Sequence, residues 1–292
     1  MHGFRSVSLA AMVTISILAG AAPAMAGEEI PGWYLDAELA QVMTAGNSES
    51  STLGLGAKLR RVWSQSELTF TGGATQTESS LLTRTAQGTP TDYQILEDKV
   101  TTKTAEIYFA RGWYQYSISP KFFVYSGVDW LANRFAGIDS RFLIALGAGN
   151  NWKDTDKLKL KTFYSLTYTF QEDVVENPFV KSDFPGFRFG YDLKLQLSGT
   201  TNFESTLVGD WNLDNSDDLR FDWYNSLPVA ISETLQLKPA LQMLWRNQPA
   251  LTTVPLLDGA GVPTGENVTT PLKKMDTIFT LALVVKLGPK AE

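Results

Sequence analysis

The residues best suited to chemistry near the start of the chain are carboxylates at alternate positions. Asp36 and Glu38 are two residues apart, and Lys58 and Arg60 repeat that spacing further along. If both segments are strands, all four side chains can face one side, because side chains alternate along a strand. Two such carboxylates could hydrolyse a glycan by acid–base catalysis. A salt-bridged interior explains the same residues without turnover, and we favour it.

Histidine and cysteine limit the chemistry further. The only histidine is His2, and the chain has no cysteine. Loss of an N-terminal leader would leave no imidazole to activate serine, water or zinc. Disulfides, thiolate chemistry and a cysteine-linked lipid anchor are excluded as well. We therefore predict a non-enzymatic protein without a cofactor. The net charge of −6 gives no indication of a nucleic-acid partner.

Oxygen-bearing side chains recur at every second position between residues 210 and 218, which are Asp210, Asn212, Asp214, Ser216 and Asp218. Calcium binds such oxygen clusters. A solvated hairpin tip is the alternative that we favour, so we predict no metal site.

The first 26 residues have the features of a signal peptide. Arg5 gives a positive start, residues 7–22 are almost wholly apolar or small, and Ala24-Met25-Ala26 forms an A-x-A cleavage site. We expect cleavage after Ala26, which leaves residues 27–292 as one exported domain. No later segment is apolar for long enough to span a membrane as a helix.

The elements that position these residues are predicted from period-two alternation. Between residues 187 and 197 the odd positions are apolar, and Arg188, Asp192 and Lys194 lie between them. A helix would spread both sets around its surface, whereas a strand separates them onto two faces. A barrel strand requires that separation, because one face meets lipid and the other meets the lumen. We predict an all-β fold, a single antiparallel transmembrane β-barrel of about twelve strands with short periplasmic turns and longer extracellular loops.

The predicted strands occupy residues 32–44, 51–63, 66–76, 101–117, 121–133, 140–152, 157–171, 186–198, 202–213, 219–230, 234–247 and 274–287. Every second connection between them is short, whereas the others include 77–100, 172–185 and 248–272. Long loops on one side indicate an even strand number. We expect 248–272, which contains glycine and proline, to be a mobile outer loop.

Two features of these strands bear on the lipid face. We expect all eight tryptophans near strand ends, in girdles at the membrane interfaces: Trp33, Trp63, Trp113, Trp130, Trp152, Trp211, Trp223 and Trp245. In 101–117, however, Arg111 shares a face with Ile107, Phe109 and Trp113. A bulge or a reversed facing would resolve that conflict.

Inward positions carry charges of both signs, which are expected to pair across the bore. An arginine or lysine facing mid-membrane lipid would instead cost about 2–4 kcal/mol. The predicted lumen-lining residues are Asp36, Glu38, Lys58, Arg60, Asp129, Arg141, Lys159, Lys161, Arg188, Asp192, Lys194, Glu204, Asp210, Arg220, Asp222, Lys238, Arg246 and Asp276.

Two motifs resemble a known family. One is the segment 33–48 with Gly46, Asn47 and Ser48 at its turn. The other runs from Asn133 to Arg141, followed by Gly147-Ala148-Gly149, and contains Arg134, Phe135, Ala136, Gly137, Asp139 and Arg141. Together they resemble the salt-induced outer-membrane proteins, a family of unknown function. The resemblance implies an outer-membrane barrel and supplies no catalytic residue. The chain departs from many barrels by ending on Ala291-Glu292 instead of an aromatic residue.

From these observations we predict a non-enzymatic outer-membrane barrel. It would act as a narrow pore for ions or small solutes, or stabilise the envelope, with a link to salt or envelope stress. The expected partners are outer-membrane lipid, lipopolysaccharide and the barrel-assembly machinery, and the oligomeric state is open. The alternatives are a barrel enzyme using inward carboxylates on lipid or glycan, and a surface receptor or adhesin using the long outer loops.

Overall fold

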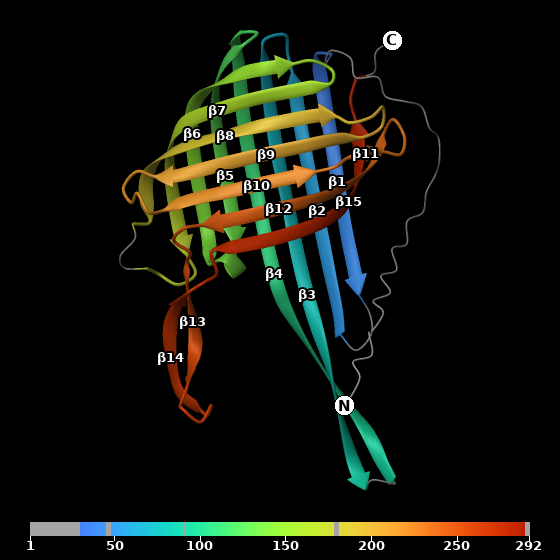
Figure 1. The fold of residues 1–292 in the computed structure, drawn as a ribbon, viewed down its shortest axis with the longest axis vertical. Coiled ribbons are helices and arrows are strands. Elements are labelled where there is room, and N and C mark those ends of the chain that lie inside the picture. The colour runs from blue at the N-terminus through green and yellow to red at the C-terminus, as the bar shows by residue number, and fades with distance from the viewer. Residues whose placement is uncertain (1–29, 45–47, 90–91, 178–180, 290–292) are drawn as a thin grey trace.

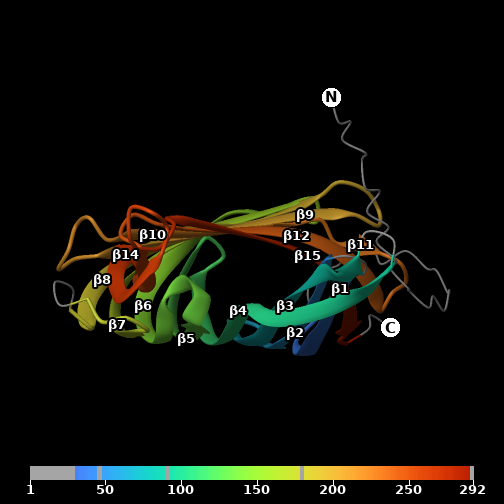
Figure 2. The same cartoon turned by 90° about the horizontal axis from the view of Figure 1, so that it is seen from below.

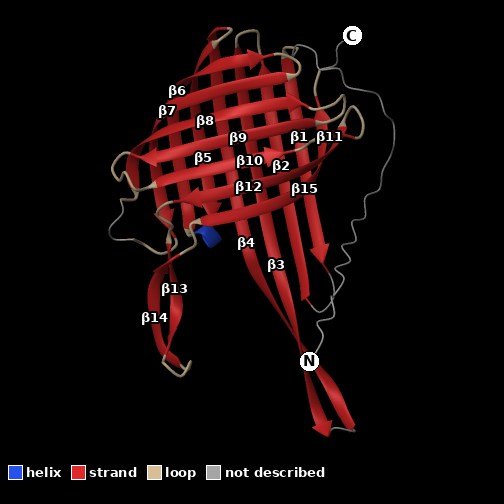
Figure 3. Ribbon diagram, in the orientation of Figure 1, coloured by secondary structure: helices blue, strands red, loops and turns tan. Residues whose placement is uncertain are grey.

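The chain is built almost entirely of β-strands in the computed structural model, which describes residues 30–44, 48–89, 92–177 and 181–289 (Figure 3). The predicted signal peptide and the motif residues Gly46 and Asn47 lie outside these residues. The strands are β1 (Gly32–Thr44), β2 (Ser48–Val62), β3 (Ser66–Thr89), β4 (Asp92–Ser119), β5 (Phe122–Asn133), β6 (Ile138–Asp154), β7 (Leu158–Asp173), β8 (Asp183–Gln196), β9 (Asn202–Asn212), β10 (Leu219–Ser226), β11 (Val229–Ala230), β12 (Leu235–Arg246), β13 (Leu251–Leu257), β14 (Pro263–Pro271) and β15 (Met275–Leu287).

Twelve of these strands close into a ring. Strands β1 to β10 pair in sequence order, β1 also pairs with β15, and β12 pairs with both β15 and β10. Every pairing is antiparallel, and closure leaves no free edge around the ring. The prediction of a closed barrel of about twelve strands is therefore confirmed (Figure 1). Among the described residues, no helix has the length and apolar character needed to cross a membrane.

The ring is flattened. Figure 2, seen from below the view of Figure 1, shows two facing walls, with β1 to β5 on one side and β9, β10, β12 and β15 on the other. Side chains from strands on opposite sides of the ring can therefore reach each other across the interior.

Two of the three regions that were predicted as long loops, 77–100 and 248–272, are hairpins, so the prediction that they lack strands was wrong. Strand β3 continues to Thr89 and β4 begins at Asp92, so residues 77–89 and 92–100 extend the barrel wall beyond a bulge after Thr77. Residues 248–272 contain the separate two-stranded sheet of β13 and β14. Both regions are rich in threonine, and β-branched residues favour strands even where the segment is polar.

The barrel therefore has two distinct ends. Both hairpins extend from one end, which we call the hairpin end (Figure 1). The opposite, short-turn end carries the connections 63–65, 120–121 and 155–157. At that end β10 stops at Ser226 and β11 covers only two residues, although one strand was predicted over 219–230. Pro228 lies between them, and proline cannot donate a ladder hydrogen bond.

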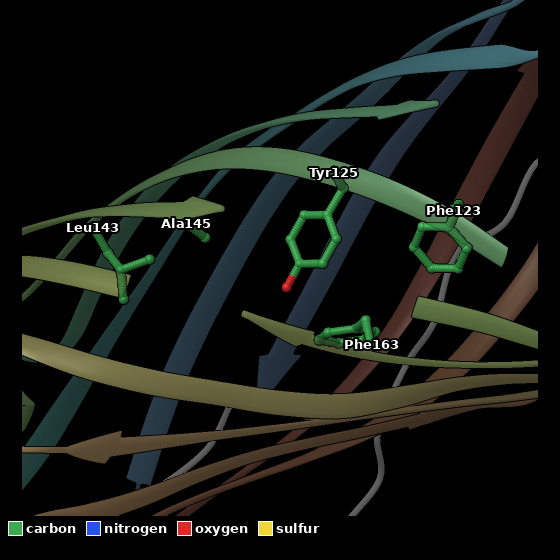
Figure 4. Close-up of a cluster of buried hydrophobic side chains, with 5 residues drawn as sticks. All are labelled: Phe123, Tyr125, Leu143, Ala145 and Phe163. Carbon is green, nitrogen blue, oxygen red and sulfur yellow. The ribbon is translucent and has the colours of Figure 1, made fainter. Parts of the chain in front are cut away.

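Part of the interior is filled by an apolar cluster of Phe123, Tyr125, Leu143, Ala145 and Phe163, contributed by β5, β6 and β7 (Figure 4). The ring of Phe123 lies over Gly149, where an added Cβ would be 2.2 Å from a ring carbon. Glycine at that position lets the aromatic ring lie close to the wall.

Trp113 packs against this cluster and stacks on Tyr125 with ring centroids 3.8 Å apart. Its predicted place in an interface girdle was therefore wrong. In β4 the face that carries Phe109, Arg111 and Trp113 points inward, as the reversed-facing alternative supposed. The outward face of β4 carries small side chains and tyrosines, of which Tyr108 and Tyr114 are exposed.

Candidate functional site

The candidate site is the polar interior of the barrel. Register partners in adjacent strands share a face, and the pairings place the predicted lumen residues on the same inner face as Arg188. These are Asp36, Glu38, Lys58, Arg60, Asp129, Arg141, Lys159, Lys161, Asp192, Lys194, Glu204, Asp210, Arg220, Asp222, Lys238, Arg246 and Asp276.

Arg111 belongs to the same interior although the sequence left its facing open. The Arg111 guanidinium donates to Asp222, with Nη2 and Oδ2 3.5 Å apart. Strands β4 and β10 are separated by β5 to β9 on one side of the ring and by β3, β2, β1, β15 and β12 on the other. The ion pair therefore joins diametrically opposed strands across the bore.

A second set of charges lies in the half filled by the aromatic cluster. Arg188 donates to both oxygens of Asp210, at 2.7 and 3.1 Å, and also to Asp129 on β5. The Arg188 side chain is only 10% exposed. A bidentate arginine–carboxylate contact fixes both position and orientation. This network therefore holds β5, β8 and β9 together and fills that part of the interior.

Arg220 occupies the hairpin end of the same half. Its Nε donates to Asp218 Oδ1 at 2.8 Å, and its Nη1 donates to Gln171 at 2.7 Å. Asp218 lies in the turn before β10. Burial acts to raise the pKa of Asp218, but the hydrogen bond and charge of Arg220 outweigh it and hold that pKa below its ordinary value.

Water reaches other inward charges. The Arg111 side chain is 46% exposed, Lys194 is 48% exposed and Lys161 is 33% exposed. The barrel wall covers these side chains from outside, so their exposure is to the lumen. Beside them, β2 and β3 present the small inward residues Gly54 and Gly73. The aromatic cluster and the Arg188 network thus fill one part of the interior, whereas Arg111, Lys161 and Lys194 keep accessible surface.

The carboxylate pair proposed for hydrolysis is engaged with cations. Glu38 forms an ion pair with Lys238 from β12. Asp36 lies opposite Lys58 on one neighbouring strand and opposite Lys286 on the other. The arrangement is that of paired charges in a polar interior.

The oxygens between residues 210 and 218 are also used in other contacts. Asn212 Oδ1 accepts hydrogen bonds from the backbone N–H groups of Asp214 and Asn215, at 2.9 and 3.2 Å. Asp214 pairs with Lys181. Within the described ranges, no group of three or more His, Cys, Asp or Glu side chains is placed to hold a metal ion.

The outer face is apolar in its middle. Leu146, Leu166 and Phe279 are each about two-thirds exposed, at 66%, 68% and 67%. Between Phe142 and Trp152 on β6, ten residues rise about 33 Å along the strand, or about 25 Å along the axis at a tilt near 40°. That height matches the lipid-facing band of membrane barrels.

The second resemblance motif forms a structural joint at the hairpin end. The side chain of Asn133 accepts from the N–H of Ala136, which caps the short 3-10 helix η1 (Arg134–Ala136). Gly137 follows with a φ of 75°, and Arg134 pairs with Asp139 at 2.8 Å. An added Cβ on Gly137 would be 2.4 Å from the Cβ of Ala250. The motif thus seats the base of the β13–β14 hairpin. Phe135 is exposed.

A closed antiparallel ring with an apolar outer band and a charged interior defines a porin-like β-barrel of the outer-membrane type. The chain belongs to the family described as "Protein of unknown function, DUF481", whose model matches residues 37–254. No curated protein matches the chain.

Several solved structures are similar in outline. The NanC porin is 8% identical, with a TM-score of 0.43 over 87% of this chain and 100% of that one. The KdgM porin is 8% identical, with a TM-score of 0.39 over 86% of this chain and 98% of that one. An outer membrane channel from Pseudomonas putida F1 is 9% identical, with a TM-score of 0.40 over 90% and 97%. None of these likenesses transfers a function.

Proposed function

We propose that the protein is a narrow outer-membrane channel for ions or small hydrophilic solutes. The observation that carries this proposal is the exposure of Arg111 and Lys161 inside a closed barrel. Charged side chains that are covered by the wall yet partly exposed require water in the lumen. An apolar outer band places the barrel in lipid, where a polar bore is a route for solutes.

The proposed route follows the accessible inward charges and runs along the edge of the packed part, where Lys161 lies over the ring of Trp113. From the hairpin end it passes the small residues Gly54 and Gly73, reaches the Arg111–Asp222 pair, and leaves past Lys161 and Lys194. The Arg188 network and the aromatic cluster fill the packed part. The Arg111–Asp222 pair joins opposed strands across this route, so a solute has to pass it, and we call this point the constriction.

Single-channel recording of the refolded barrel in a planar bilayer tests the proposal. We expect small, discrete conductance steps, and larger steps for Arg111→Ala because truncation removes the side chain from the bore. Lys181→Ala is the matched control, since Lys181 lies outside the barrel and pairs with Asp214. Absence of steps from both the wild type and Arg111→Ala would reject the channel and leave the envelope-stabilising role.

A surface receptor is the second candidate, and the β3–β4 hairpin favours it. Ile95, Leu96 and Val100 on this hairpin are 51%, 49% and 57% exposed. They lie ten or more residues beyond Ala110, the register partner of the interface residue Trp130. Apolar side chains that gather into an exposed patch are typical of binding surfaces, and Leu96 and Val100 lie on the same face of β4. If the protein is a surface receptor, deleting residues 82–99 should abolish binding of its ligand to whole cells. The conductance of the barrel should stay unchanged.

Export and the link to salt stress stay predictions. Fractionation should recover the mature chain in the outer membrane with heat-modifiable gel mobility, and N-terminal sequencing should begin at Gly27. Growth of a deletion strain at high salt tests the stress link. Contacts with lipopolysaccharide and the assembly machinery belong to the same proposal, and the engaged state of Glu38 gives no support to the enzyme alternative.

A further inference from the structure

The acidic groups in the middle of the bore have few free hydrogen-bonding positions. Asp222 accepts from Arg111 at one oxygen and from Gln242 at the other, the latter at 2.7 Å. Both oxygens of Asp210 accept from Arg188. Asp192 accepts from Thr206 at 2.7 Å through Oδ1, and its Oδ2 lies 3.3 Å from Lys161. A cation entering the bore meets carboxylates that are already satisfied.

The guanidinium groups differ from these carboxylates, because several of their N–H donors make no hydrogen bond. Arginine has five N–H donors, and the Arg111 contact with Asp222 is a single long one of 3.5 Å. In the described part of the chain, no acceptor lies within hydrogen-bond distance of the Arg141 guanidinium. The Nε of Arg246 is buried without a partner. An anion entering the bore therefore meets unused donors.

The arginines at the hairpin end also oppose one another. Arg220 and Arg246 are direct cross-strand partners on the inner face, and Arg141 lies within electrostatic reach of both. Like charges placed opposite each other in a sheet are destabilising. Asp218 and Asp173 offset part of this repulsion at Arg246, and Asp210 and Asp129 offset part of it at Arg141. A bound anion would relieve the repulsion that remains.

The other inward carboxylates each lie beside a cation. Asp36 is flanked in register by Lys58 and Lys286. Asp276 is within electrostatic reach of Arg246 and Lys273. Neither occupies the constriction, where Arg111 is the most exposed charge at 46%, against 24% for Asp222 and 22% for Asp129, the cross-strand partner of Arg111.

We propose that the bore selects anions and that Arg111 is its selectivity-determining residue. The inference rests on the proposed channel function and deepens it. An anion at the constriction exchanges water for charge-assisted hydrogen bonds from Arg111. Arg141 and Arg246 give it a second contact at the hairpin end, and Lys161 and Lys194 lie beyond the constriction.

Reversal potentials in a potassium chloride gradient test the selectivity. We expect the wild type to favour chloride. Arg111→Gln should lose about fivefold of the preference, the Boltzmann factor for a unit charge 4 Å away in watery surroundings. Arg111→Lys should keep most of it, and Lys181→Gln should match the wild type. A conducting barrel that favours potassium, or an Arg111→Gln variant with unchanged preference, would overturn the inference and leave the channel intact.

A binding measurement separates this inference from failure of the channel. Isothermal titration of the detergent-solubilised barrel with inorganic phosphate should show binding, and Arg141→Gln combined with Arg246→Gln should weaken it at least tenfold. Heat-modifiable mobility would verify that each variant is folded. If the barrel does not conduct but binds phosphate in this way, the channel is rejected and the anion site stands. If it neither conducts nor binds phosphate, both are rejected.

Discussion

Arg188 and Asp210, on the neighbouring strands β8 and β9, are joined by two hydrogen bonds of 2.7 and 3.1 Å inside the barrel. The same guanidinium also donates to Asp129 on β5. One buried cation thus serves two carboxylates on strands that are not neighbours. The three residues form a brace across one half of the flattened ring.

Replacing Arg188 with methionine should destabilise the barrel by roughly 3–5 kcal/mol, because it leaves two largely buried carboxylates without a cation. Urea titration of the folded fraction in lipid vesicles measures the change. Lys181→Ala removes an exposed ion pair and should cost at most about 1 kcal/mol. Equal stabilities of the two variants would show that the brace contributes nothing.

The outer band should tolerate no charge at its centre. Leu166 is 68% exposed at mid-strand in β7, and Leu166→Lys should destabilise the barrel in a bilayer by about 2–4 kcal/mol because lipid cannot solvate the ammonium group. Leu257→Lys is the control, since Leu257 is 51% exposed on the hairpin strand β13. Unfolding titrations in vesicles compare them. Similar losses in both variants would argue against a lipid-facing position for Leu166.

A comparison of alanine variants at Gly137 and Gly261 separates the effect of a steric contact from the effect of backbone strain. Both have positive φ values, of 75° and 82°, but an added Cβ meets Ala250 only at Gly137 and open space at Gly261. Each alanine variant should lose about 1 kcal/mol from the left-handed backbone. Gly137→Ala should also loosen the β13–β14 hairpin, detected as faster proteolytic cleavage within residues 248–272. Equal cleavage rates for the two variants would exclude a seating role.

Acid should weaken the turn before β10. The pKa of Asp218 lies below its ordinary value of 3.8 in the folded protein, so ionisation of Asp218 favours the folded state. That contribution is complete above the ordinary value and is lost as the pH falls through the lowered pKa.

The free energy of unfolding of the wild type should therefore fall below about pH 4, and Asp218→Asn should show a smaller fall from a lower starting value. Asp217→Asn controls for the loss of one charge from the same turn. Parallel pH profiles for the wild type and Asp218→Asn would contradict the argument.

The sequence predicted the ring well where apolar and polar residues alternate. Residues 187–197 predicted a strand over 186–198, and β8 spans Asp183–Gln196. The prediction of strands from the sequence failed where apolar and polar residues do not alternate. The threonine-rich parts of β3 and β4 extend beyond the apolar outer band, and their few apolar residues, such as the adjacent Ile95 and Leu96, do not alternate with polar ones. Polar composition there reflects exposure of both faces and not the absence of strands.

The alternation of apolar and polar residues was enough to determine which residues share a face. In an extended backbone successive side chains point to opposite faces, and polarity separates the lipid-facing set from the water-facing set. The sequence could not determine what crosses the interior. Arg111 and Asp222 are 111 residues apart, and their contact depends on the register of every strand between them and on the flattening of the closed ring. Trp113 faces inward for the same reason, since the ring supplies an aromatic cluster for it to pack against. The Arg111–Asp222 contact and the inward position of Trp113 both depend on the geometry of the whole barrel. Only the tertiary structure could therefore determine them.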